Sequence, residues 1–196
     1  MRQFIIVGRD VPTTGDFSLD SLTEAGRMDL LARCVTASLL LSHGIRDDVR
    51  THLVLRDEFT IRFDGSELRG LHPDERSTAA LIRNALGERA EAIGHIPVEV
   101  SAGVSLFRMG FEETLDSVEE DGVICQLHPD GKTKADAPVP ENPVFVLSNH
   151  EPLSEADAAM LERYVDQRIS LGPRALHADH AIAVTHNWLD LAGHSE

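Results

Sequence analysis

The run Val144-Phe145-Val146-Leu147-Ser148-Asn149-His150-Glu151-Pro152 places four consecutive apolar residues directly before a polar segment that ends in proline. A short apolar run of this kind is typical of a buried strand. Similar strands are predicted at residues 122–127 and 168–171, and helices at 111–120, 154–167 (with Ser154 as N-cap) and 177–191. This alternation predicts an α/β fold with a mainly parallel sheet between helices.

The first half of the chain carries the same kinds of element. It opens with a strand-like segment at residues 2–8. An apolar stripe at helical spacing then predicts a helix from Leu22 to Gly44. Two further strands are predicted, at residues 51–55 and 59–63, with Asp64-Gly65 as the turn that follows.

A second helix and two irregular segments complete the pattern. Asp74 is a candidate N-cap for a helix over residues 75–86, which Gly87 ends. Residues 87–110 are less regular and are interpreted as carrying loop. Residues 128–143 form a polar, proline-rich connector between two predicted strands.

The charge of the chain is unusual. It has 33 acidic residues against 18 lysines and arginines, for a formal net charge of −15, and the lysines are confined to Lys132 and Lys134. An acidic, lysine-poor surface suits a cytoplasm of molar salt, where charges are screened within about 3 Å. We therefore hypothesise a salt-adapted source. Taken alone, this charge argues against nucleic-acid binding, so any RNA contact must depend on where the arginines gather.

Length and composition set the broad class. A chain of 196 residues with 42% hydrophobic residues suits one globular domain with a real core. No apolar run approaches the ~18 residues of a membrane span, so we expect a cytoplasmic protein without a membrane partner. Cys34 and Cys125 lack metal-ligand spacing and are expected to be reduced, buried thiols.

Common catalytic signatures are missing from the chain. The sequence has no GxGxxG or Walker-type phosphate loop and no GxSxG elbow. His177, His180 and His186 make a metal-dependent hydrolase conceivable, but no third ligand has suitable spacing, so structural or loop-ordering roles are expected and no metal site is predicted.

Strand ends point to the ligand site. In parallel sheets, ligands bind beyond the carboxyl ends of the strands, where the loops gather. The loops that begin at Leu127, Leu147 and Leu171 follow three predicted strands. We therefore expect the site where these loops meet.

Two stretches carry a family resemblance. The C-terminal one contains Phe145 to Pro152, Ile169-Ser170-Leu171-Gly172-Pro173 and Leu176 to Ile182; the N-terminal one contains Gly26 to Val35, Phe63 to Leu68 and His72 to Arg76. Together they resemble the archaeal tRNA pseudouridine-54 N1-methyltransferase family of the SPOUT superfamily. The resemblance implies one SPOUT domain over residues 1–196, with a deep trefoil knot in a cofactor-binding part at about 122–192. It also implies S-adenosyl-L-methionine as cofactor, a homodimer, and tRNA rather than DNA as partner.

On this resemblance the three loops are the knot loops that hold the cofactor. Adenine needs a flat apolar slot with polar partners at its edge, Gly172 allows close backbone approach, and Pro173 stiffens the turn. The family's second loop commonly carries Gly-Asp-His where this chain has Ser148-Asn149-His150. The expected cofactor-binding residues are Leu127, Leu147, Ser148, Asn149, Ile169, Ser170, Leu171, Gly172, Pro173, Leu176 and Ala181.

The N-terminal stretch supplies candidate catalytic residues. Pseudouridine keeps a proton on N1, so methyl transfer needs that proton removed and the developing anion stabilised. A carboxylate can take the proton or orient the base, and an arginine can steady the anion. The candidates are Arg27, Asp29, Asp64 and Arg69, with Arg33 beside them.

RNA contact requires a local patch of arginines rather than a basic protein. Such a patch is expected in the N-terminal half, from Arg27, Arg33, Arg62, Arg69, Arg76 and Arg108. The base must also be extruded from a folded tRNA loop. Two alternatives stay open beside the hydrolase: N1-methylation of a pseudouridine in ribosomal RNA, and a non-catalytic RNA-binding or assembly protein on the same fold.

Overall fold

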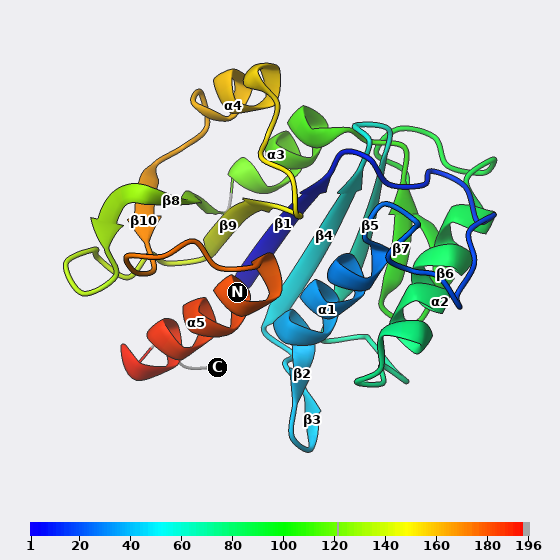
Figure 1. The fold of residues 1–196 in the computed structure, drawn as a ribbon, viewed down its shortest axis with the longest axis horizontal. Helices are drawn as coiled ribbons and strands as arrows, with labels where there is room; N and C mark the ends of the chain where they lie inside the picture. The colour runs from blue at the N-terminus through cyan, green and yellow to red at the C-terminus, as the bar shows by residue number, and fades with distance from the viewer. Residues whose placement is uncertain (121, 194–196) are drawn as a thin grey trace.

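One sheet organises the protein. The structure, a computed structural model, describes residues 1–120 and 122–193. In these residues eight strands form a sheet in the order β10-β8-β9-β1-β4-β5-β7-β6 (Figure 1). The strands are β1 (Arg2–Gly8), β4 (Val49–Leu55), β5 (Phe59–Asp64), β6 (Val98–Ser101), β7 (Val104–Phe107), β8 (Val123–Thr133), β9 (Pro143–Ser148) and β10 (Gln167–Ser170).

The sheet has a parallel half and an antiparallel half. β1 lies at the centre and pairs in parallel with both β4 and β9, while β8 pairs in parallel with β9 and β10. β5, β7 and β6 add antiparallel strands beyond β4. The predicted α/β fold with a mainly parallel sheet is confirmed, and the parallel half brings the carboxyl ends of β1, β8 and β9 to one edge.

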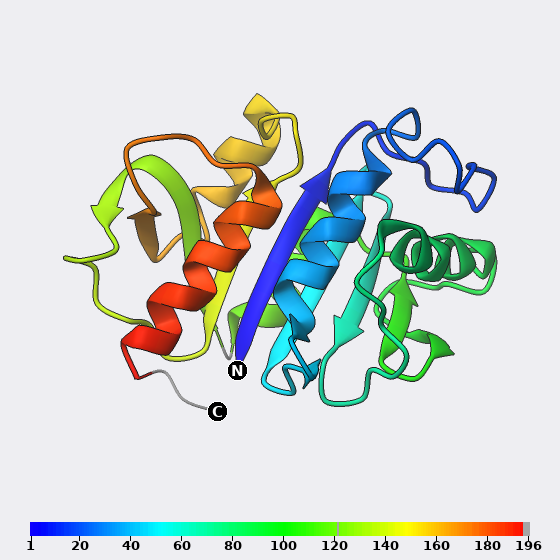
Figure 2. The ribbon, with the colours of Figure 1, turned by 60° about the horizontal axis from the view of Figure 1, so that its bottom comes forward.

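Helices cover both faces (Figure 2). α1 (Met28–Leu39), α2 (Glu75–Gly87) and α5 (Ala178–Leu191) pack on one face, and α3 (Phe111–Glu119) and α4 (Glu155–Leu161) pack on the other. Because successive strand residues point to opposite faces, Phe4 and Ile6 join the core under α1 and α5, and Ile5 joins the core under α3 and α4.

The first helix is shorter than the sequence predicts. α1 begins only at Met28, because Gly26 and Arg27 both adopt left-handed backbone conformations that break the helical path. It ends at Leu39, since Leu40 is extended and starts a small hairpin of β2 (Leu40–Leu41) and β3 (Gly44–Ile45).

Three other predicted boundaries differ. Residues 87–110, interpreted as loop, contain the β6–β7 hairpin at the sheet edge. The predicted helix 154–167 ends at Leu161. Just before β10, the Asp166 carboxylate accepts a hydrogen bond from the Ile124 backbone N–H of β8. The connector 128–143 is strand up to Thr133.

Several further expectations can be compared with the structure. Cys34 and Cys125 are free and buried, as predicted. None of the helices in the described ranges is long and apolar enough to cross a membrane. The single-domain prediction over residues 1–196 includes residues 121 and 194–196, which lie outside the described residues, and it stays a prediction.

Candidate active site

A cavity of about 200 Å³ lies at the carboxyl ends of β9 and β10 and beside residues 127–129 in the middle of β8. Three segments line it: Leu127, His128 and Pro129; Leu147, Ser148 and Asn149; and Ile169, Ser170, Leu171, Gly172, Arg174, Ala175, Leu176, Ala178 and Ala181. The segments that begin at Leu127, Leu147 and Leu171 therefore meet, although the first of them is a bulged part of β8 rather than a loop after it. Every residue that the sequence predicts to bind the cofactor, except Pro173, lines the cavity. We refer to the cavity as the cofactor pocket after that prediction.

The strand pairing opens this pocket. β10 pairs with β8 at Gln126 and then again at Lys132, so the intervening residues of β8 bulge away from the ladder. Gly131 allows this crossing, because an added Cβ there would lie 2.6 Å from backbone atoms of Arg168 and Ile169. Sequence reasoning missed His128 and Pro129, which lie on the bulge and were interpreted as connector.

The pocket chemistry suits a nucleoside. Its walls are mostly aliphatic, and Asn149 is 8% exposed at its edge. The Asn149 backbone donates to Val7 O at 3.0 Å and its Oδ1 accepts from the Glu151 backbone at 3.0 Å, but Nδ2 is buried with no hydrogen-bond partner in the described chain. A buried donor without a partner is costly, so a ligand acceptor at Nδ2 would satisfy it. The residues present therefore fit an adenosyl group.

A charged cluster adjoins the pocket at the first turn of α5. Arg33 Nε donates to Asp179 Oδ2 at 2.9 Å, and its Nη1 donates to Asp29 at 3.0 Å and to Glu75 at 2.9 Å. Arg27 pairs through two nitrogens with both oxygens of Asp29, each at 3.0 Å. Since Asp179 follows pocket residue Ala178, Arg27 and Asp29 are connected to the cofactor pocket through Arg33.

The backbone under Arg27 is held in a rare conformation. Arg27 has φ 61°, as does Gly26. An added Cβ on Gly26 would lie 1.8 Å from Asp10 O, so only glycine fits there. A left-handed arginine costs roughly 1–2 kcal/mol and such strain concentrates at functional sites. It aims the guanidinium at Asp29 while leaving the Arg27 side chain 34% exposed.

The charges in the cluster shift the pKa values of Asp29 and Arg33 in opposite directions. Burial favours the protonated form of Asp29, but hydrogen bonds from Arg27 and Arg33 outweigh it and hold the pKa of this carboxyl below its ordinary value. Burial opposes the charge of Arg33, yet its three carboxylate partners raise its pKa. Asp29 is thus a weak base with both oxygens engaged, which suits orienting Arg27 better than removing a proton.

The other catalytic candidates lie elsewhere. Asp64 ends β5, which runs antiparallel to β4, so it sits opposite Arg50 at the amino end of β4 and accepts from Arg50 Nε at 2.6 Å. Hydrogen bonds from Ser66 and Arg50 outweigh burial and lower the Asp64 pKa. Arg69 donates to the Leu68 carbonyl at 2.9 Å. The structure brings Arg27 and Asp29 together and leaves Asp64 and Arg69 outside that cluster.

The histidines are dispersed in role. The His177 and His180 rings lie 6.0 Å apart, whereas His186 is buried and donates through Nε2 to Ser38 O at 2.9 Å, with Arg2 at its Nδ1. His186 is thus a structural residue of the α1–α5 interface, as the sequence leads us to expect. No group of three potential metal ligands is found within residues 1–120 and 122–193.

Comparisons with known proteins agree with this geometry. Residues 1–194 match the model of a protein family described as "Putative SAM-dependent RNA methyltransferase". Among solved structures, Archaeoglobus fulgidus Nep1 bound to S-adenosylhomocysteine superposes with a TM-score of 0.65 at 12% identity, over 98% of this chain and 99% of that one. That likeness supports the fold.

Closer relatives come from archaea. The tRNA (pseudouridine(54)-N(1))-methyltransferase of Haloarcula marismortui is 61% identical over 98% of both chains, and that of Haloferax volcanii is 58% identical over 100% of this chain and 99% of its own. The enzyme of the same name from Methanocella arvoryzae is 40% identical over 96% and 97%. The first two are from halophiles, which supports the salt-adapted source that the acidic composition indicated. With a family match over nearly its whole length and relatives of this similarity, the chain belongs to the SAM-dependent RNA methyltransferase family.

Proposed function

We propose that this protein transfers a methyl group from S-adenosylmethionine to N1 of pseudouridine 54 in tRNA. The observation that carries the proposal is the Arg33–Asp179 ion pair, which connects the substrate-side cluster of Arg27 and Asp29 to the cofactor pocket. The choice of base and RNA is supported by relatives with that activity in their names at 40–61% identity.

The cofactor pocket holds the nucleoside part of the methyl donor. Leu147, Ile169 and Leu171 form apolar walls for adenine, and Asn149 Nδ2 supplies a donor at the edge. Arg174 at the rim offers a cation to a carboxylate. When bound, the cofactor supplies an electrophilic methyl group.

The charged cluster acts on the pseudouridine. Arg27 is fixed by its two hydrogen bonds to Asp29, and its partly exposed guanidinium stabilises negative charge as the N1 proton passes to a water molecule. Asp29, ionised and engaged by two arginines, is a positioning residue for Arg27. Asp64 and Arg69, outside the cluster in one chain, act on the reaction only if a second chain brings them near it.

The finer architecture belongs to the same proposal. We place a deep trefoil knot in residues 122–192, supported by the family resemblance and by the meeting of the three loops. We also propose a homodimer, because Leu176 on the pocket wall is 43% exposed in the single chain and a second chain would cover it. The substrate supports a cytoplasmic location. A crystal structure with S-adenosylhomocysteine tests the knot and the dimer together.

The function is tested by methylation in molar KCl. The protein is incubated with labelled S-adenosylmethionine and tRNA transcripts that carry pseudouridine or uridine at position 54, followed by nucleoside mass spectrometry. We expect N1-methylpseudouridine from the first transcript and no product from the second, because uridine has no N1 proton. Absence of product from the pseudouridine transcript, with cofactor binding intact, contradicts the proposal.

Two rivals are separated by further measurements. RNA from a deletion strain should lose the methyl group at tRNA position 54; loss only in ribosomal RNA would establish the rRNA activity instead. Calorimetry with S-adenosylmethionine tests the non-catalytic RNA-binding protein, since folded protein that binds no cofactor in high salt would support that rival.

A further inference from the structure

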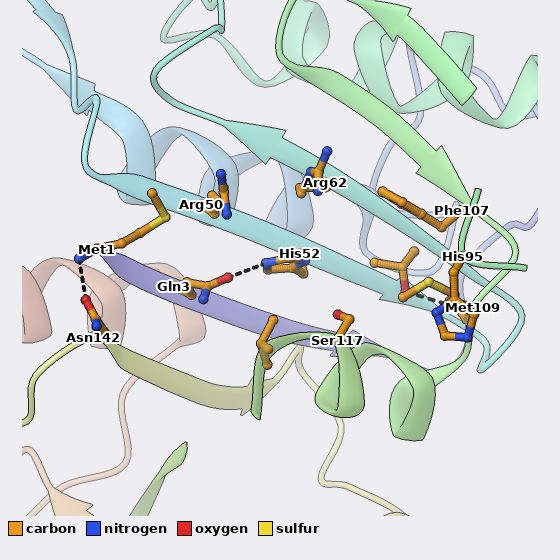
Figure 3. Close-up of a pocket in the computed structure, with 12 residues that line it drawn as sticks. Met1, Gln3, Arg50, His52, Arg62, His95, Phe107, Met109, Ser117 and Asn142 are labelled. Carbon is orange, nitrogen blue, oxygen red and sulfur yellow. Dashed lines mark hydrogen bonds between the residues drawn. The ribbon is translucent and has the colours of Figure 1, made fainter. Parts of the chain in front are cut away.

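A second cavity, of about 470 Å³, lies between the strands of the sheet and α3 (Figure 3). This is the face of the sheet opposite to the one covered by α1, α2 and α5. Gln3 of β1, Arg50 and His52 of β4 and Arg62 of β5 form its floor, and Phe107 and His95 stand at one end. We call it the sheet-face pocket. Its lining includes Met1, Gln3, Arg50 and His52 from the amino ends of β1 and β4, whereas the cofactor pocket lies at the carboxyl ends of β9 and β10.

The charge of this pocket is opposite to that of the chain. The chain has 33 acidic residues and a net charge of −15. Yet none of the described residues that line the pocket is Asp or Glu, and the lining includes Arg62 and Arg50, the second of which is paired with Asp64. An electropositive concavity in an acidic protein concentrates anions, and a partly enclosed site is screened by salt less than an open surface.

Arg62 carries the strongest signal. Its Nε is buried with no hydrogen-bond partner, and within residues 1–120 and 122–193 the guanidinium forms no ion pair. The Arg62 guanidinium carbon lies over the Phe107 ring, 5.0 Å from its centroid. A buried guanidinium nitrogen without an acceptor is costly, so the position is best explained by a ligand that supplies one.

Arg50 lies on the strand next to that of Arg62 and is held in place by Asp64. Asp64 holds Arg50 through Nε at 2.6 Å, which leaves the terminal nitrogens of Arg50 available. In the β4–β5 register Arg50 faces Asp64 and His52 faces Arg62, so both arginines project from the same face of adjacent strands. Two guanidinium groups arranged in this way suit a phosphate.

The rest of the pocket suits a base. His52 Nε2 donates to Gln3 Oε1 at 2.9 Å. This hydrogen bond leaves the Gln3 amide N–H groups as donors, and His52 Nδ1 as an acceptor, for a ligand. Burial, together with the charges of Arg62 and Arg50, lowers the His52 pKa to about 3, so the ring is neutral. Phe107 and His95 offer flat rings, and Ile93 and Ile96 beside His95 are 68% and 67% exposed.

We infer that the sheet-face pocket binds a phosphorylated nucleoside, with phosphate on Arg50 and Arg62 and the base beside Phe107 over the Gln3–His52 pair. The source we favour is a nucleotide of the RNA substrate away from the methylated base, a choice that rests on the proposed function. Binding there anchors the RNA without touching the methyl-transfer site.

The test compares variants with matched controls in molar KCl. Arg62→Gln removes the unpaired charge, and Arg62→Lys restores a charge without the fork. Ser117→Glu, on an exposed turn of α3 at the pocket, adds a carboxylate without altering the sheet. The controls are Arg83→Gln and Asn84→Glu on α2, which make the same charge changes on the other side of the sheet.

The measurements are tRNA affinity by fluorescence anisotropy, steady-state methylation, S-adenosylhomocysteine affinity by calorimetry, and histidine NMR shifts with uridine 5′-monophosphate. We expect Arg62→Gln and Ser117→Glu to weaken tRNA binding and raise KM for tRNA about tenfold. Arg62→Lys should recover part of the loss. The kcat at saturating tRNA, the S-adenosylhomocysteine affinity and both controls should stay unchanged.

The outcomes separate the sources and the two proposals. Loss of tRNA affinity without a uridine 5′-monophosphate response supports an RNA strand, whereas shifts of His52 and His95 that Arg62→Gln abolishes support a free nucleotide. If the wild-type protein binds tRNA but methylates none, the proposed function is refuted. The pocket inference is then decided by whether Arg62→Gln weakens tRNA binding. Wild-type tRNA affinity in both Arg62→Gln and Ser117→Glu, with no nucleotide response, overturns the inference.

Discussion

Arg33 Nε lies 2.9 Å from Asp179 Oδ2, a contact that joins residues 146 positions apart in the chain. It ties α1 to the first turn of α5, where Asp179 is flanked by Ala178 and lies close to Ala181 on the pocket wall. The sequence predicts a cofactor-binding role for neither residue. The Arg33–Asp179 pair therefore connects the wall of the cofactor pocket to the charged cluster of Arg27, Asp29 and Arg33.

Replacing Asp179 by Asn should weaken the contact between Arg33 and the first turn of α5. A hydrogen bond to a charged group contributes about 1.5–3 kcal/mol, so we expect S-adenosylhomocysteine affinity to fall roughly tenfold. Calorimetry in molar KCl measures it. The matched control is Glu112→Gln, which removes the carboxylate of an exposed pair with Arg163 and should leave affinity unchanged. Equal affinities in all three proteins would show that α5 needs no tether.

Arg27 is tested with the backbone kept intact. Arg27→Gly accommodates the left-handed conformation and removes only the side chain. We expect kcat to fall by roughly 10²-fold, as for loss of a group that stabilises an anion, with cofactor affinity unchanged. Arg27→Lys should recover little, because a lysine cannot form the paired contact with Asp29. A kcat near wild type in Arg27→Gly would remove this residue from the mechanism.

The turn before α1 gives a stability prediction with an internal control. Gly26→Ala and Gly70→Ala both force alanine into a left-handed conformation, at φ 61° and 73°. An added Cβ at Gly70 meets open space, whereas at Gly26 it meets Asp10 O. Urea denaturation should show a loss of about 1–2 kcal/mol for Gly70→Ala and a clearly larger loss for Gly26→Ala. Similar losses would mean that the Asp10 contact relaxes freely.

Two buried histidines make stability depend on pH. Burial lowers the pKa of His52 and His186 to about 3, against 6.5 when exposed. The unfolded chain therefore binds protons that the folded chain does not, and the free energy of unfolding falls as pH drops from 6.5 toward 3. His186→Gln should remove about 1 kcal/mol of the fall between pH 6.5 and 5.5, and less between pH 7.5 and 6.5, because only half of the unfolded histidine is protonated at pH 6.5. Urea titrations at pH 7.5, 6.5 and 5.5 measure it, and unchanged slopes would contradict the assignment.

The acidic composition predicts a salt requirement. With a net charge of −15, self-repulsion grows as the screening length rises from about 3 Å in molar salt to about 30 Å at 0.01 M. We expect unfolding or aggregation when KCl is dialysed away, followed by circular dichroism and light scattering. Full stability in dilute buffer would count against salt adaptation.

Local pattern predicted much of the parallel half. The apolar run 144–147 and its polar successor Ser148-Asn149 were sufficient to place one pocket loop, because the end of a buried strand in such a sheet is where ligands bind. The β6–β7 hairpin was missed, since Val98-Glu99-Val100-Ser101 and Val104 to Phe107 are short and are joined by a tight turn at Gly103.

The sequence by itself determined the α/β alternation, the pocket loops after Leu147 and Leu171 and the acidic composition, because strand ends, helix periodicity and charge are properties of short segments. Only the tertiary structure decided which charged residues meet. The antiparallel course of β5 carries Asp64 to the amino end of β4, away from Arg27, while α5 brings Asp179 to Arg33. Only the paired strands reveal the sheet-face pocket, because Gln3, His52 and Arg62 converge through inter-strand registers that no local window contains.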